Sequence, residues 1–336
     1  MLIDRFGRPL QNLRVSVANE CNYRCIFCHL EGSPLHGPLP LKEVMDKKYL
    51  EPDDYAIIAE AAARLDIAKV KITGGEPLIR HDIIKIVRSF KEHGKFDDIS
   101  MTTNGFRLAI LAQGLREAGL DRVNISIHSL KEERYKYITG VPGLSNALKA
   151  LDASIDAGFR AVKVNMVVMK NVNEDEIPEF IELAAKKGFT LQLIELHPVG
   201  LGKSVFKKHY IPLDTIERYL KQRAIKMMTR KDLHNRPIYI LDNNVKVEIV
   251  RPYNNWRFCM GCTRIRISPE GFLYPCINWH GPRIGLLDKL REPGTREEKV
   301  LRVMEAIERT NMLREPYFKP PSKTLPLGAT LTKPRG

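Results

Sequence analysis

Short runs in which apolar and polar residues alternate recur between residues 13 and 198, with helical patterns between them. The alternating runs predict β-strands at 13–19, 69–75, 98–105, 122–129, 161–169 and 190–198. Apolar residues at helical spacing predict helices at 55–65, 82–93, 146–157 and 177–187. Strands that alternate with helices in this way predict βαβ units and a parallel sheet of six strands.

The predicted strands are less apolar than a fully covered sheet requires. Strands of a parallel sheet with helices on both faces are nearly continuous apolar runs. Here Val70 and Ile72 interleave with Lys71 and Thr73, and the other strands repeat the pattern. An antiparallel sheet with one solvated face would alternate too, but the intervening helices argue against it. We therefore expect a partly closed barrel whose polar lumen binds a ligand.

The pattern changes after residue 200. Helices are predicted at 212–223 and 297–309, and hairpins at 237–250 and 264–276, which turn at Asn243–Asn244 and Pro269–Gly271. From Glu315 onward, 22 residues hold five prolines. We expect a barrel at residues 1–200, an α+β region at 201–318 and an irregular Pro-rich tail at 319–336.

Composition and charge narrow the class of protein. The 336 residues are 43% hydrophobic, enough for a sizeable core, and no run of about 18 apolar residues predicts a membrane span. The N-terminus does not read as a signal peptide, so we expect a cytoplasmic protein. The net charge of +14 fits a basic solvated surface, a nucleic acid partner or a polyanionic small molecule. The chain shows no nucleic-acid-binding signature, which favours the small molecule.

The six cysteines form two groups of three, which in a large chain favours metal over disulfides. The first triad, Cys21, Cys25 and Cys28, has the spacing C-x3-C-x2-C after the first strand. Such a set can hold a [4Fe–4S] cluster by three irons and leave the fourth open. A structural zinc ion is the alternative, although His29 adjoins Cys28 and is a poor fourth ligand.

The second triad, Cys259, Cys262 and Cys276, repeats this logic as C-x2-C-x13-C. Its last cysteine lies across a predicted hairpin from the other two. A zinc ribbon would normally bring a second C-x2-C pair. Two triads without a fourth cysteine suggest two clusters, each with one iron open to a small molecule.

These motifs resemble a known family. The first triad together with "GGEP" at 74–77 resembles the radical S-adenosylmethionine (SAM) superfamily, and the second triad followed by "RIR" at 264–266 resembles the molybdenum cofactor biosynthesis protein A family, the GTP 3′,8-cyclases. "MTTNG", "VNISIHS" and "KVNMVVM" follow that family in order, and "LREPY" looks like archaeal members. The resemblance covers about residues 4–318. It implies an α/β fold, a partial (βα)6 TIM-like radical SAM barrel with a C-terminal α+β extension carrying a second Fe–S site.

The resemblance also implies a reaction. Two [4Fe–4S] clusters and SAM would be the cofactors, and SAM cleavage would yield a 5′-deoxyadenosyl radical. This radical would abstract hydrogen from the ribose C3′ of GTP, and C3′ would bond to guanine C8, giving 3′,8-cyclo-7,8-dihydro-GTP. The enzyme would be a lyase in the first step of molybdopterin (molybdenum or tungsten cofactor) biosynthesis. Its partners would be an electron donor such as ferredoxin or flavodoxin and the downstream cyclic pyranopterin monophosphate synthase. We expect neither membrane nor nucleic acid, and a homodimer is left open.

Site residues follow from the same resemblance. The first triad would hold the cluster that cleaves SAM, and the second triad the cluster that binds guanine. Gly75, Ser126 and Phe27 would contact SAM. The triphosphate would be bound by Arg14, Lys71, Thr102, Lys163, Arg264 and Arg266, because charge-assisted hydrogen bonds to phosphate oxygens are strong.

Three departures from bacterial members stand out: His197 and Gln192 replace a common Met and Arg, and the chain ends "KPRG" without paired glycines. Two other functions are weighed against the cyclase. One is a radical SAM peptide-modifying maturase with an auxiliary cluster, which usually has more C-terminal cysteines. The other is a zinc- or cluster-stabilised nucleic-acid-binding protein.

Overall fold

The computed structural model describes residues 1–31 and 49–317, so the predicted tail at 319–336 lies outside the described residues. Six parallel strands lie side by side in chain order: β1 (Asn12–Ser16), β2 (Lys69–Thr73), β3 (Asp98–Thr103), β4 (Arg122–Ser126), β5 (Ala161–Val168) and β6 (Thr190–Glu195). Each one falls within a predicted strand, except that β1 begins one residue before the predicted range. The six-stranded parallel sheet predicted from the alternation is thus confirmed.

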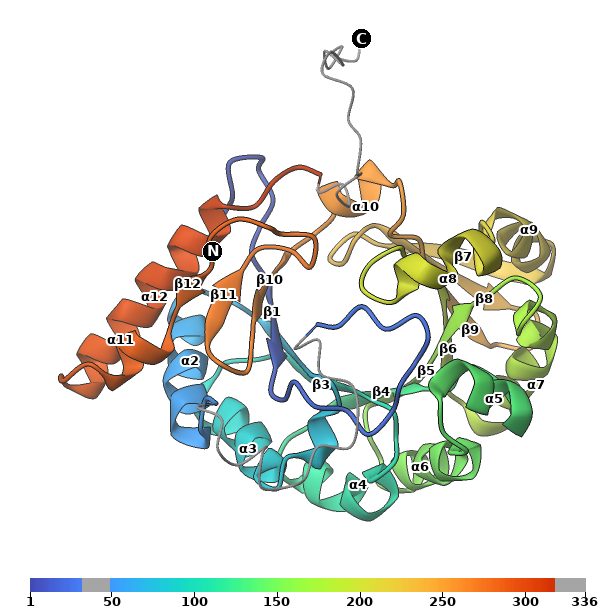
Figure 1. The fold of residues 1–336 in the computed structure, drawn as a ribbon, viewed down its shortest axis with the longest axis horizontal. Helices are drawn as coiled ribbons and strands as arrows, with labels where there is room; N and C mark the ends of the chain where they lie inside the picture. The colour runs from blue at the N-terminus through green and yellow to red at the C-terminus, as the bar shows by residue number, and fades with distance from the viewer. Residues whose placement is uncertain (32–48, 318–336) are drawn as a thin grey trace, which may run out of the picture.

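Helices cover the outer side of this curved sheet (Figure 1). They are α2 (Pro52–Arg64), α3 (Ile83–His93), α4 (Leu108–Glu117), α5 (Glu132–Thr139), α6 (Leu144–Asp156) and α7 (Ile177–Lys187). The sequence analysis gave no range for α5, and it indicated α4 only through Gly119, a residue at which a helix should stop. The structure is a partial (βα)6 barrel, as expected.

The two faces of the strands differ as the alternation predicts. The apolar positions are fully or almost fully buried under the helices: Leu13, Val15, Val70, Ile72, Met101, Ile125 and Val164. Burial of each such side chain contributes roughly 1.5–3 kcal/mol. The polar positions face the lumen, and the register sets them side by side, Arg14 beside Lys71 and Asn124 beside Lys163. The fold therefore lines its own interior with polar groups.

The C-terminal region extends the same sheet at both edges. Strand β10 (Arg264–Ile267) pairs parallel with β1, and β9 (Lys246–Val250) pairs parallel with β6. The remaining strands, β7 (Ala224–Arg230), β8 (Arg236–Leu241), β11 (Phe272–Tyr274) and β12 (Ile284–Gly285), complete a twelve-stranded sheet. Both predicted hairpins are confirmed, with Asn244 (φ 62°) and Gly271 (φ 80°) at their turns. Because one sheet runs through both parts, the division at residue 200 stays a prediction.

Five further helices belong to this extension: α8 (Gly202–His209), α9 (Asp214–Arg223), α10 (Trp256–Met260), α11 (Leu287–Arg291) and α12 (Arg296–Met312). Only α9 and α12 were predicted. Helix α12 starts at Thr295, whose side chain accepts from the Glu298 N–H. It lies against α2 (Figure 1), where Glu297 pairs with Arg64 at 2.6 Å. None of the helices within residues 1–31 and 49–317 is long and apolar enough to cross a membrane.

Candidate functional site

The lumen contains a cavity of about 400 Å³. Both cysteine triads line it. So does every residue for which the sequence predicted a SAM or triphosphate contact: Gly75, Ser126, Phe27, Arg14, Lys71, Thr102, Lys163, Arg264 and Arg266. His197 and Gln192 line it too. The structure therefore brings all of these candidates together, while their individual roles stay predictions.

The first triad lies on the loop after β1, which crosses the opening of the barrel (Figure 1). Two backbone bonds fix this loop to the C-terminal end of α5: the Arg24 N–H donates to the Thr139 carbonyl at 2.9 Å and the Ile26 N–H to the Ile138 carbonyl at 3.0 Å. The Tyr23 N–H points at Cys21 Sγ, 3.4 Å away. Backbone donors of this kind favour a thiolate, the form that binds metal.

The second triad is assembled by the β10–β11 hairpin. Cys259 lies on α10, Cys262 precedes β10 and Cys276 follows β11. The antiparallel pairing of the two strands returns the chain to the start of β10, and this brings Cys276 to the same cavity as the other two. The arrangement predicted across the hairpin is therefore present.

Both triads fit a cluster better than a single ion. Within the described residues, no three His, Cys, Asp or Glu side chains form a group that could hold one metal ion, and the cysteines form no disulfide. A zinc site needs four ligands around one point, whereas a cluster binds one thiolate per iron. Burial raises the pKa of the Cys21 thiol to about 12, and the Glu76 carboxylate adds to this rise. A positively charged group is thus needed to hold the thiolate form.

The glycines of "GGEP" are required by close packing of the protein backbone. A Cβ on Gly75 would come within 2.1 Å of the Glu20 carbonyl oxygen. The Gly75 N–H donates to the Ala18 carbonyl at 2.7 Å, so this loop is bound to the segment that leads into the first triad. Glu76 accepts from Thr103 Oγ1 at 2.6 Å and from the Asn104 N–H at 2.7 Å. The motif thereby joins the carboxyl ends of three neighbouring strands, β1, β2 and β3.

Two cations in the cavity wall have no carboxylate partner among the described residues, the half-buried Lys71 and the buried Arg264. Burial, and next the charges of Arg122 and Arg14, hold the pKa of Lys71 well below its usual range. Burial and Arg14 likewise lower the pKa of Arg264 to about 9. Like charges held together in a buried site are stabilised by a bound anion.

Other cations of the cavity are paired with carboxylates that the sequence analysis missed. Arg14 and Arg266 both contact Glu31, Arg14 at 2.7 Å. Lys163 contacts Glu248. The sequence could have indicated an inward position for Glu248, since it is the polar residue between Val247 and Ile249 of a predicted strand. No sequence pattern indicated Glu31.

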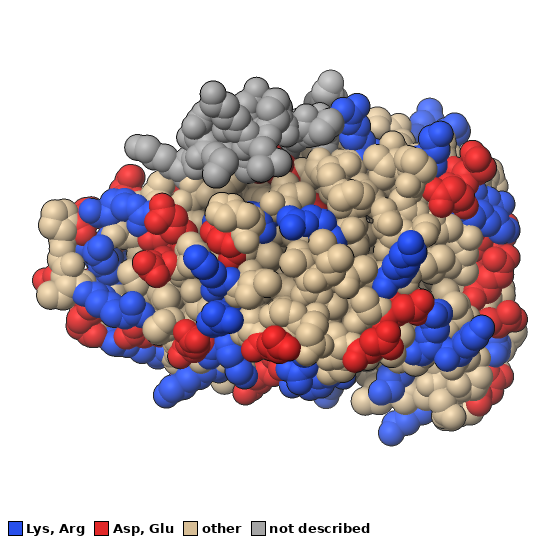
Figure 2. Space-filling view, turned by 90° about the horizontal axis from the view of Figure 1, so that it is seen from below, with Lys and Arg blue, Asp and Glu red and all other residues tan. Residues whose placement is uncertain are grey.

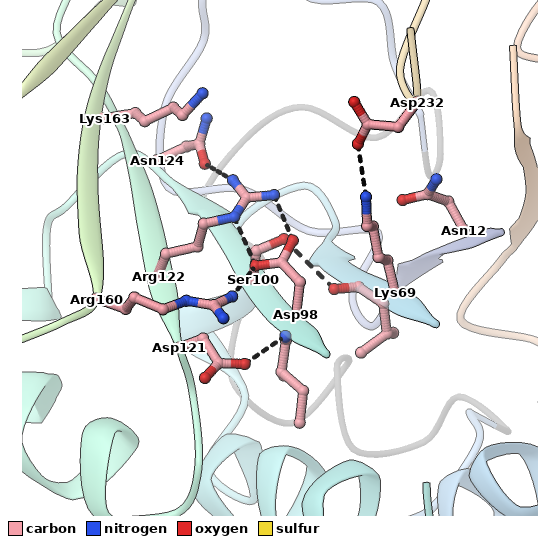
Figure 3. Close-up of polar contacts among 12 residues, drawn as sticks. Asn12, Lys69, Asp98, Ser100, Asp121, Arg122, Asn124, Arg160, Lys163 and Asp232 are labelled. Carbon is pink, nitrogen blue, oxygen red and sulfur yellow. Dashed lines mark hydrogen bonds and ion pairs between the residues drawn. The ribbon is translucent and has the colours of Figure 1, made fainter. Parts of the chain in front are cut away.

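The amino ends of the strands, at the end of the barrel opposite the loop of the first triad, carry a network of ion pairs (Figure 3). Asp98, the first residue of β3, accepts from Arg122 at 2.7 and 2.6 Å and from Arg160 at 3.0 Å. The remaining Arg122 nitrogen donates to Asn124 at 3.1 Å. Lys69 and Asp232 form a further ion pair at 2.5 Å. Arg122 is therefore fully engaged within the protein and forms part of the cavity floor.

The remaining wall of the cavity carries Phe27, a predicted SAM contact, and the two residues that differ from bacterial members, His197 and Gln192. The Phe27 ring meets the His128 ring edge-on, with centroids 4.8 Å apart. His197 follows β6, and its Nδ1 is buried without a hydrogen-bond partner among the described residues. Gln192 lies beside Glu248 in the sheet register.

Sequence comparisons agree with this site. The model of the Radical SAM superfamily matches residues 15–184, about half of the chain, and the model named Molybdenum Cofactor Synthesis C matches residues 189–320. A protein named probable GTP 3′,8-cyclase from Aeropyrum pernix is 45% identical over 318 residues, which is 95% of this chain and 88% of that protein. One of the same name from Saccharolobus solfataricus is 42% identical over 95% of this chain and 99% of its own length.

Solved structures show the same fold at low identity. Streptococcus suis SuiB bound to S-adenosylmethionine is 16% identical with a TM-score of 0.63, and the match covers 84% of this chain and 64% of SuiB. A structure described as native anSMEcpe with bound AdoMet is 16% identical with a TM-score of 0.56, over 88% of this chain and 84% of that one. A superfamily match over half of the chain and near-complete alignment to relatives at 42–45% identity lead to one assignment. The chain belongs to the radical SAM superfamily and, within it, to the GTP 3′,8-cyclase family.

Proposed function

We propose that the chain is a GTP 3′,8-cyclase, a lyase that converts GTP to 3′,8-cyclo-7,8-dihydro-GTP in the first step of molybdenum cofactor biosynthesis. The names of its relatives and the C-terminal family match support this reaction. The cavity supports it as well. Two separate cysteine triads and two cations without a carboxylate partner among the described residues, Lys71 and Arg264, all face one space of about 400 Å³.

The first triad would hold a [4Fe–4S] cluster that binds SAM. When bound and reduced, this cluster supplies the electron that cleaves SAM and generates the hydrogen-abstracting radical. The protein's own contribution is to shape the space around it. The "GGEP" loop packs on the segment before Cys21, while Ser126 presents a hydroxyl and Phe27 an apolar ring to the cavity. Placement of the reacting groups at such a site can account for a large part of the rate.

The second triad would hold a second [4Fe–4S] cluster, at which the guanine would bind. Arg264 lies two residues after Cys262, and both Arg264 and Arg266 belong to β10. Guanine at this triad and phosphates at the lumen cations would fix both ends of GTP. The ribose between them would then face the SAM side of the cavity.

The test is anaerobic incubation of the reconstituted protein with SAM, a reductant and each nucleoside triphosphate in turn. We expect 5′-deoxyadenosine and a cyclised product with GTP only. A variant with the second triad replaced by alanine is the control, and it should still cleave some SAM without forming product. Product from another triphosphate, or none from GTP while the clusters are intact, would contradict the proposal.

Several finer expectations belong to the same proposal: an electron donor such as ferredoxin or flavodoxin, transfer of the product to cyclic pyranopterin monophosphate synthase, and a cytoplasmic location. The maturase alternative receives only fold-level support, because the solved neighbours are about 16% identical. The nucleic-acid alternative receives no support from the face shown in Figure 2, because Lys and Arg are interspersed there with Asp and Glu. The net charge of +14 does not gather there into one basic patch.

A further inference from the structure

Three cations, carried by β5, β7 and β8, surround one buried carboxylate on β9 in the cavity wall. Glu248 is fully buried and contacts Lys163, Arg236 at 3.3 Å and Arg230 at 3.5 Å. We call these four residues the Glu248 cluster. Three positive charges against one negative charge leave it with a net charge of +2. The pair formed by Lys69 and Asp232, which Arg230 also touches, leaves this surplus unchanged.

Arg236 is the member of the cluster with unused donors. Its Nη1 donates to Glu248 Oε1, but its Nε is buried without a partner in the part of the chain that the structure describes. Its Nη2 also donates no hydrogen bond to any of the described residues. Arg236 lines the cavity, and its guanidinium carbon lies 5.7 Å from the ring centre of Phe258, the residue before Cys259. A buried guanidinium with donors to spare indicates a missing acceptor.

We propose that Arg236 is a further anion-binding residue of this cavity, which donates hydrogen bonds to phosphate oxygens of the bound nucleoside triphosphate. The inference rests on the proposed function and adds a residue that neither the motifs nor the family resemblance indicated. A guanidinium is suited to this role because its planar fork matches two phosphate oxygens at once. Glu248 fixes one edge of the fork and leaves the rest for the ligand.

Arg236 could instead serve only as a counter-ion that keeps Glu248 buried. The two roles differ in what they do to phosphate affinity. A counter-ion would change stability when replaced, whereas a phosphate ligand would change the affinity for anything that carries the triphosphate. Binding must therefore be measured with ligands that separate the phosphates from the nucleoside.

The experiment is anaerobic equilibrium dialysis of the full chain with reconstituted clusters, using GTP, inorganic tripolyphosphate and guanosine as probes. In R236Q we expect roughly tenfold or greater loss of affinity for GTP and for tripolyphosphate, and no change for guanosine. R236K should recover part of the loss because the charge returns without the fork. R218Q, which removes the same charge from an exposed position on α9, is the matched control and should bind like the wild type.

If R236Q does not fold, the double variant R236Q/E248Q replaces it, because it removes one charge of each sign and keeps the surplus of +2. Wild-type affinity for tripolyphosphate in either variant, with R264Q weakened, would overturn the role of Arg236 and leave the proposed function standing. Equal affinity of the wild type for guanosine and GTP would overturn the proposed function itself.

Discussion

Arg14 on β1 donates from Nε to both carboxylate oxygens of Glu31, at 2.7 and 2.9 Å. Glu31 lies three residues after Cys28, and its carboxylate is also bound by Arg266 on β10. The loop that carries the first triad is therefore tied to two of the cations that are predicted to bind phosphate. A carboxylate of the protein therefore contacts two of the cations that we assign to the triphosphate.

Replacing Glu31 by Gln should make the protein depend on an added anion. The buried Arg266 and the half-buried Arg14 lose their negative partner, and breaking a fully buried pair costs about 3–5 kcal/mol, an upper bound for this pair. Tripolyphosphate can supply the missing charge. We expect it to raise the melting temperature of E31Q by more than that of the wild type, in thermal unfolding under anaerobic conditions. E305Q is the control, because Glu305 forms an exposed pair with Arg309 at 3.8 Å. Equal shifts in E31Q and the wild type would contradict this account.

The sequence predicted the barrel well because its strands alternate in a way that few other structures require. The helices and strands for which the sequence analysis gave no range lack a regular apolar pattern of this kind. Helix α4 is ten residues long and contains Gly114, and α5 has eight residues with charged ones at its start. Strand β7 lies at the edge of the sheet with most of its side chains exposed, so it shows no apolar face.

Every predicted site residue lines the cavity, because the motifs lie on the loops and inward strand positions that a barrel brings together. The carboxylates and Arg236 were harder to predict. Lys163 and Glu248 are 85 residues apart and meet only because β6 and β9 pair. An ion pair of that kind depends on tertiary structure, and residue spacing alone does not reveal it.

The two triads should hold separate clusters with separate tasks. Replacing the first triad by alanine should abolish SAM cleavage, and the same change in the second triad should preserve some cleavage but no cyclised product. Iron analysis should give about eight irons per chain for the wild type and about four for each triple variant. Full iron content together with product formation in the second variant would show that our assignment of that triad is wrong.

GTP binding should take up a proton at Lys71. Burial and the charges of Arg122 and Arg14 hold the pKa of Lys71 well below its usual range. A bound triphosphate favours the charged amine and raises this pKa, so the affinity for GTP should fall as the pH rises above the lowered pKa of the free protein. Titration calorimetry in buffers of different ionisation enthalpy measures the uptake. It should be smaller in K71M and unchanged in K226M, a variant of exposed β7. Identical uptake in K71M and the wild type would exclude Lys71 as its source.

Glu195 should make the protein less stable as the pH rises. Burial raises the pKa of this carboxyl from 4.5 to about 7, and its Oε2 has no hydrogen-bond partner among the described residues. The native state therefore binds the proton more tightly than the unfolded chain does. The resulting stability is present below pH 4.5 and is lost between pH 4.5 and 7. In E195Q this loss should be absent, so the variant should gain on the order of 2 kcal/mol over the wild type at pH 8 and little at about pH 4. Denaturant unfolding at the two pH values provides the comparison, and an equal difference at both would count against it.

The central claim is that the cavity presents the ribose C3′ of GTP to the radical derived from SAM. The basis is the placement of two cysteine triads and the unpaired cations Lys71 and Arg264 around one space, which would hold the guanine and the phosphates and leave the ribose between them. The most direct measurement uses GTP deuterated at C3′ and mass spectrometry of the 5′-deoxyadenosine that is released. If the radical abstracts the hydrogen at C3′, deuterium appears in 5′-deoxyadenosine. Turnover of the labelled GTP with no deuterium in 5′-deoxyadenosine would contradict it.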